Sequence, residues 1–186
     1  MEPVTESPDE DTLSALLGRL RVRSSVWCRS EMSAPWGFGV PARESASFHL
    51  FVEGEGWVEI GGVDGRLHLG TGDLVILPTG RRHTVRDDPA SSVTMLETIL
   101  DSVPMENGLL RYGGDGPRTD LVCGGFDIEE GESNPLIASL PPVLVVRGEN
   151  GRPVEWLQST WTCFERKGTR PSRASRLSWP VSQTSS

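Results

Sequence analysis

The fold is decided by the stretch Gly72-Asp73-Leu74-Val75-Ile76-Leu77-Pro78-Thr79-Gly80-Arg81-Arg82-His83, which has the form G-x5-P-x-G-x2-H. The first two residues predict a turn, and the apolar run that follows predicts a buried strand. Pro78 and Gly80 favour a tight turn, after which the next strand begins. We therefore expect the imidazole of His83 to face the interior of a β-barrel.

The same strand-like pattern continues on both sides of this stretch, from Ser24 to about Gly125. Short apolar or β-branched runs alternate with glycine-rich turns at a spacing typical of all-β barrels and sandwiches. The predicted strands are Ser24–Ser30, Phe48–Val52, Trp57–Ile60, Arg66–Leu69, Asp73–Leu77, Thr119–Cys123 and Val143–Val146. The 21 glycines and 14 prolines argue against a helical bundle.

Helical periodicity flanks the strands. Leu13, Leu16, Leu17 and Leu20 recur at one helical face and predict a helix over about 11–21. A short helix is expected over 134–140, and a second amphipathic helix over 153–167, where three aromatic residues share one face. We expect a flexible N-terminus (1–10), one domain (11–152) that includes the leading helix, the C-terminal helix (153–167) and a disordered basic tail (168–186).

Composition and charge exclude several classes of protein. The longest apolar runs are only a few residues, far below the roughly 20 that a membrane helix needs. The acidic first residues do not resemble a secretory signal, which indicates a cytoplasmic protein. The formal net charge is −8, while residues 166–186 carry five basic residues and no acidic one. An acidic body is a poor surface for nucleic acid, so we expect no sequence-specific DNA binding by this chain.

The form G-x5-P-x-G-x2-H resembles the second motif of the cupin superfamily. The resemblance narrows to the amino-terminal domain of AraC/XylS-type transcription regulators, and covers about residues 10–165. The stretches that carry it are Leu13–Leu20, Ser33–Gly37, Phe48–Leu50, Glu53–Trp57, Gly72–His83, Cys123–Phe126, Pro135-Leu136 and Leu140–Val143. The resemblance implies a double-stranded β-helix (jelly-roll) barrel that senses an effector and lies ahead of two helix-turn-helix units.

The sequence departs from the wider superfamily at the metal site. Catalytic cupins carry a first motif with two histidines and a glutamate, which bind a metal together with the histidine of the second motif. Counting back from the turn at Glu53, we place the glutamate at Ser47 and the histidines near Val40 and Ala42. None of these three residues can bind a metal, so we expect no enzymatic activity of the dioxygenase or isomerase kind.

A second departure concerns the DNA-binding region. Two helix-turn-helix units need on the order of 100 residues. Only about 20 residues follow the predicted C-terminal helix. We therefore expect this chain to be truncated before the DNA-binding region.

A different metal site is suggested by two histidines and two cysteines. His49 lies two residues beyond Ser47, so strand alternation places it on the inward face with His83. Imidazole and thiolate are ligands of tetrahedral zinc, which makes a Zn²⁺ site a candidate. Its ligands would be Cys28, His49, His83 and Cys123. Two alternatives stay open, namely a hydrogen-bonded core histidine beside a small buried thiol, or a cluster that responds to oxidation.

Several of these inward positions also define a candidate ligand pocket. Its predicted residues are Trp36, His49, Phe51, Trp57 and His83. Aromatic residues in a small barrel usually just fill it, so the two tryptophans are expected to be core residues rather than pocket residues. His68 lies in an alternating segment whose polar side chains are expected to face solvent.

The leading interpretation is a sensory domain that binds a small molecule or metal, or senses redox state, inside the barrel. Two alternatives belong to other classes. One is a small metal-dependent cupin enzyme that uses His49 and His83 as ligands. The other is a free-standing module that dimerises through its aromatic C-terminal helix. We also expect the chain to form a homodimer.

Overall fold

The computed structural model describes residues 22–106, 108–128 and 139–149, without the side chains of 22–28 and 126–128. The predicted helices at 11–21 and 153–167, the N-terminus 1–10 and the tail 168–186 lie outside the described residues. Most of the short helix predicted at 134–140 also lies outside them. No helix in the described part of the chain is long and apolar enough to span a membrane.

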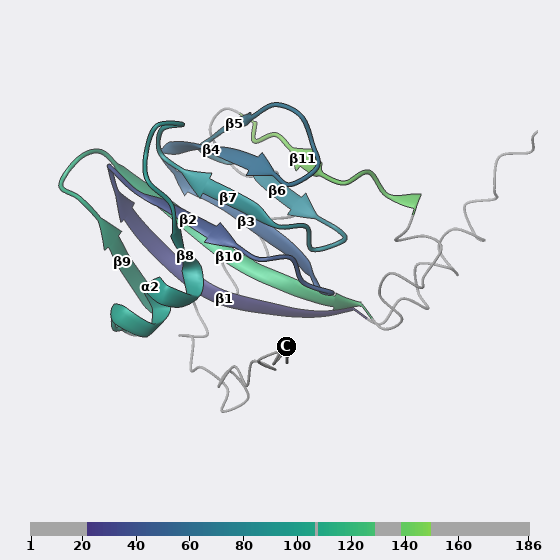
Figure 1. Ribbon diagram of the computed structural model, residues 1–186, viewed down its shortest axis with the longest axis horizontal. Coiled ribbons are helices and arrows are strands. Elements are labelled where there is room, and N and C mark those ends of the chain that lie inside the picture. The colour runs from purple at the N-terminus through teal and green to yellow at the C-terminus, as the bar shows by residue number, and fades with distance from the viewer. Residues whose placement is uncertain (1–21, 107, 129–138, 150–186) are drawn as a thin grey trace, which may run out of the picture.

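Six strands form one sheet, and five strands form a second sheet that faces it (Figure 1). In spatial order, the first sheet contains β11 (Leu144–Val146), β6 (Leu74–Leu77), β3 (Ala46–Glu53), β10 (Arg118–Ile128), β1 (Val22–Ser33) and β9 (Leu109–Gly113). In spatial order, the second contains β5 (Leu67–Gly70), β4 (Glu55–Ile60), β7 (His83–Arg86), β2 (Gly37–Val40) and β8 (Thr94–Met95). Most neighbouring pairs are antiparallel, whereas β9 pairs with β1, and β8 with β2, in parallel.

One hydrophobic core lies between the two sheets. Its fully buried members come from strands of both sheets, because alternate residues of each strand point inward. The largest of these side chains are Trp36, Phe38, Phe51, Met32 and Leu69. The predicted all-β class is confirmed, while the double-stranded β-helix closure stays a prediction.

A second, smaller apolar cluster lies on the outer face of the six-stranded sheet. Leu50, Leu74 and Val122 form it, each no more than 5% exposed. These residues come from β3, β6 and β10, and they alternate along their strands with residues that face the core. This sheet therefore buries apolar side chains on both faces.

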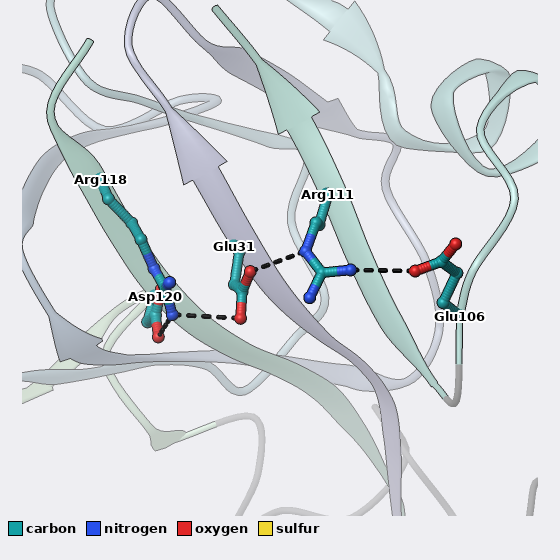
Figure 2. Close-up of polar contacts among 5 residues, drawn as sticks. All are labelled: Glu31, Glu106, Arg111, Arg118 and Asp120. Carbon is teal, nitrogen blue, oxygen red and sulfur yellow. Dashed lines mark hydrogen bonds and ion pairs between the residues drawn. The ribbon is translucent and has the colours of Figure 1, made fainter. Parts of the chain in front are cut away.

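The outer face of the six-stranded sheet also carries an ion-pair network, which lies over β1, β9 and β10 (Figure 2). Glu31 of β1 accepts hydrogen bonds or ion pairs from Arg111 of β9 at 2.9 Å and from Arg118 of β10 at 3.1 Å. Arg111 also donates a hydrogen bond to Glu106 at 3.0 Å. Arg118 donates two hydrogen bonds to Asp120, at 2.5 and 2.6 Å. The network joins three neighbouring strands at the edge where β9 is the last strand.

The structure adds elements that the sequence pattern did not predict. Helix α2 (Leu96–Ser102) interrupts the region expected to consist of strands, and it buries Leu96 and Ile99 against the core. This helix could have been predicted from the helical spacing of its apolar residues, Leu96, Ile99, Leu100 and Val103. Strands β2, β8 and β9 also lack a matching prediction, because they are short or interrupted by glycine.

Candidate functional site

Two histidines from opposite sheets meet in the core. In β3, Ser47, His49 and Phe51 are fully buried, and they alternate with side chains on the outer face. His83 is the first residue of β7 and lies three residues beyond Gly80 of the turn. Both imidazoles therefore face inward, where the sequence pattern placed them, and His83 is only 3% exposed.

The two rings belong to a buried hydrogen-bond chain. His49 Nε2 lies 2.7 Å from His83 Nε2, and the two ring planes are inclined at 62°. On its other side, His49 Nδ1 lies 3.1 Å from Cys123 Sγ of β10. His83 Nδ1 lies 2.8 Å from the main-chain oxygen of Arg81. The chain thus runs from a thiol through two imidazoles to a carbonyl.

The terminal carbonyl sets the direction of every hydrogen bond in the neutral chain. Because the Arg81 oxygen can only accept, His83 Nδ1 carries a proton and donates. Neutral His83 therefore accepts at Nε2, so His49 must donate from its own Nε2. His49 Nδ1 then accepts, and the thiol of Cys123 is its donor.

Burial keeps both histidines neutral. The pKa of His49 lies well below its ordinary value because the ring is fully buried, and because His83 and the positive charge of Arg43 also disfavour protonation. Burial likewise lowers the pKa of His83; its bond to the Arg81 carbonyl opposes this effect, and Arg43 adds to it. At neutral pH the hydrogen-bond directions given above therefore apply.

The candidate zinc ligands are only partly brought together. Cys123 and His83 contact different nitrogens of His49, and those nitrogens point away from each other, so the three donors do not converge on one point. Over 22–106, 108–128 and 139–149 no group of three or more His, Cys, Asp and Glu is arranged to hold an ion. Cys28 lies opposite Cys123 in the β1–β10 register, but its side chain is outside the described residues. The four-residue zinc site stays a prediction.

The positions assigned to the usual cupin ligands hold no ligand side chain. Ser47 is fully buried, and its hydroxyl has no hydrogen-bond partner within the described part of the chain. Val40 lies opposite His83 in the β2–β7 register, and Ala42 is exposed just beyond β2. This donor set does not fit the three-histidine, one-glutamate metal site.

The predicted ligand pocket inside the barrel is a packed core. Trp36 and Phe51 are at most 2% exposed, and Phe38 separates Trp36 from His49 with ring centroids at 6.2 and 5.7 Å. The predicted placement of Trp57 is corrected. On β4 its neighbours point inward, whereas Trp57 packs on the exposed ring of His68 at 4.7 Å. The alternation of β4 puts Trp57 on the other face of the sheet.

The open space lies at the end of the barrel, beside His83. A groove of about 910 Å³, here called the His83 groove, is lined by loops and by the ends of β2, β4, β7 and β8. Apolar residues of its wall include Val40, Ile60, Val63, Val93 and Met95. Sequence reasoning missed these residues, because turns and strand ends from distant parts of the chain form the groove. His83 is the member of the buried chain that lines it.

Within the Gly72–His83 stretch, Asp73 forms hydrogen bonds to the segment that follows β11. Asp73 is buried and accepts hydrogen bonds from the main chain of Gly70 and Gly148 and from the guanidinium of Arg147, the last at 2.6 Å. Burial disfavours its charge, but these bonds outweigh that effect and lower the pKa of Asp73. The carboxylate therefore ties the start of β6 to the end of β11.

Comparison with known protein families identifies the fold. Residues 11–178 match a family model described as a cupin. The chain belongs to the cupin family. The prediction of a cupin domain is confirmed. The stretch Gly72–His83 lies within the matched residues.

Two known proteins are similar to this cupin domain. The chain is 26% identical over 167 residues to a Streptomyces lividans protein described as an AraC-like transcription regulator, covering 90% of this chain. The chain spans about half of that relative, 54% of its length. Among solved structures it is similar to YhaK from Escherichia coli, with a TM-score of 0.44 and 9% identity, over 72% of this chain and 45% of that one. The likeness to YhaK is too slight to support a functional conclusion.

Proposed function

We propose that this chain is the sensory cupin domain of an AraC-like transcription regulator and that its effector binds in the His83 groove. The observation that carries the proposal is the position of His83, which lines an open groove and also belongs to the buried hydrogen-bond chain. A ligand that contacts His83 therefore acts on a chain of bonds that reaches β10. The similarity to an AraC-like regulator supports the regulatory role.

Signalling is proposed to pass through the carboxyl-terminal part of the domain. Asp73 joins the cupin motif to Arg147 and Gly148, which precede the predicted helix at 153–167. Ligand binding in the groove would favour one packing of that helix over another. A ligand with equal affinity for both arrangements could shift nothing.

The experiment for this function has two steps. A panel of metal ions and small organic molecules is first screened by thermal shift on the purified chain. The compound that stabilises most is then used in hydrogen exchange, and we expect exchange at residues 153–166 to change at saturation. Identical exchange at 153–166 with and without that compound would contradict the sensor proposal.

Whether the buried cluster senses a metal is tested separately. Elemental analysis of protein made under zinc-replete, reducing conditions is repeated on the variants Cys123→Ser and His83→Ala. Stoichiometric zinc that both variants lose would support the four-residue site. Absence of metal from the unmodified protein would remove that site and leave a small molecule or redox state as the signal.

We also propose that the domain has no enzymatic activity and forms a homodimer. The residues at Ser47, Val40 and Ala42 support the first statement, since none can help to hold a catalytic metal. Turnover that follows metal content would contradict it. The aromatic face expected over 153–167 supports the second, and mass measured across a dilution series tests it.

A further inference from the structure

A second pocket adjoins the His83 groove. It has a volume of about 530 Å³, and its lining residues are Ala42, Arg43, Glu44, Thr79 and Arg81. Ala42 lines both spaces, so the pocket and the groove are neighbours. We call it the Arg43 pocket.

Arg43 supplies a largely buried positive charge. Its side chain is 15% exposed, and its ion pair with Glu97 is long, at 3.9 Å. The main chain of Arg43 is held in place, because its N–H donates to the Gly80 oxygen at 2.8 Å. Burial lowers the pKa of Arg43, an effect that Glu97 partly opposes, so an anion bound beside the guanidinium would offset its desolvation.

Two further donors line the same pocket. The hydroxyl of Thr79 is buried and has no hydrogen-bond partner in the part of the chain that the structure describes. Arg81 is exposed, and its guanidinium makes a long bond, 3.4 Å, to the Gly61 oxygen. Glu44 is the opposing charge in the lining, and it is exposed. Two of the five lining side chains are thus arginines, against one carboxylate.

We propose that the Arg43 pocket binds the carboxylate of a small organic anion whose apolar part lies in the His83 groove. Charge-assisted hydrogen bonds from Arg43 and Arg81 and the hydroxyl of Thr79 hold the carboxylate. This inference rests on the proposed function, because it names the chemical class of the effector.

The neighbouring groove is suited to an apolar group. Its wall exposes Val93 and Met95 and includes Ile60 and Val63. The carboxylate of Glu59, which also lines the groove, is paired with Arg66 and Arg86 at 2.6 Å each, so it repels an anion only weakly. The chain as a whole is acidic, with a formal net charge of −8, so an arginine-lined pocket marks a local exception.

Isothermal titration calorimetry of the full chain tests the proposal, with benzoate as the probe. Benzamide is the neutral comparison, and inorganic phosphate is the comparison without an apolar part. We expect benzoate to bind at least about tenfold more tightly than either, since hydrogen bonds to charged groups are each worth roughly that factor.

Variants locate the binding. Arg43→Gln should weaken benzoate binding roughly ten- to hundredfold, and Thr79→Val about fivefold, while Glu44→Gln should strengthen it. The matched control is Arg111→Gln, which removes an exposed arginine of the six-stranded sheet (Figure 2) and should leave the affinity unchanged. Unfolding curves test whether each variant is folded. If Arg43→Gln does not fold, Thr79→Val provides the test of the binding site.

Three results would overturn the proposal. They are equal binding of benzoate and benzamide, equal binding of benzoate and phosphate, and benzoate affinity unaffected by Arg43→Gln and Thr79→Val in folded protein. Failure of the sensor function would look different, because benzoate would then bind at Arg43 without changing hydrogen exchange at 153–166. If a neutral compound from the panel changes that exchange while benzoate does not bind, the sensor function stands and the anion site fails.

Discussion

Cys123 has a specific chemical role at the scale of single residues, because its thiol is the donor to His49 Nδ1 in the neutral hydrogen-bond chain. Cys123→Ala leaves that nitrogen buried without this donor, and we expect it to lower the free energy of unfolding by roughly 1–3 kcal/mol. Cys123→Ser keeps a donor and should cost less. Urea unfolding followed by tryptophan fluorescence measures both variants. If the thiol were only a small apolar group, alanine would be tolerated at least as well as serine.

The neutral histidine pair predicts a pH dependence of stability. In the folded state burial holds the pKa values of His49 and His83 below the unfolded value of about 6.5, and the charge of Arg43 adds to both shifts. Below that pH the unfolded chain binds more protons, so the free energy of unfolding is highest above pH 6.5 and falls as pH is lowered. The slope should approach about 1.4 kcal/mol per pH unit for each histidine.

Urea unfolding at several values between pH 8 and pH 5 measures this slope. The control variant is His68→Gln, which removes an exposed imidazole and should keep the same fall. A flat profile over this range, or a fall that disappears with His68, would contradict the assignment to the buried pair.

At the scale of elements, the turn between β6 and β7 depends on one glycine. Gly80 has φ +59°, and a Cβ there would lie 2.3 Å from the main-chain oxygens of Arg43 and Ser45. Gly80→Ala must displace that loop and should cost about 3 kcal/mol of unfolding free energy. Gly65 is the matched control, since its φ is +91° and a Cβ would meet nothing within 4 Å. Gly65→Ala should cost about 1 kcal/mol.

Thermal unfolding of the two glycine variants gives the comparison. Similar losses would mean that only the positive φ matters and that contact with the 43–45 loop does not. A larger loss at Gly80 would support the role of this turn in holding Arg43 and directing His83.

At the scale of the whole molecule, a single core joins both sheets. Phe51 of β3 is fully buried in that core, and its ring contacts the position of Gly56 in the opposite sheet. Phe51→Ala should reduce the free energy of unfolding by about 3–5 kcal/mol through loss of burial and creation of a cavity. Because both sheets share the core, far-UV circular dichroism and Trp fluorescence should report one coincident transition. Two separated transitions would show that the sheets unfold independently.

The sequence by itself determined the fold class and the direction of the two histidines. The turn at Pro78 and Gly80 and the two-residue period of β3 are local properties, so they place His83 and His49 inward without knowledge of the rest of the chain. The same period could have shown that Trp57 points outward, because its neighbours Gly56 and Val58 face the core.

Only the tertiary structure decided which of these groups touch and where a ligand can enter. His49 is 34 residues from His83 and 74 from Cys123, and their contacts depend on how the strands pair and how the sheets face each other. Pairing between distant strands depends on packing across the sheets rather than on any local spacing. For the same reason the His83 groove and the Arg43 pocket, which loops from separate parts of the chain enclose, have no signature in the sequence.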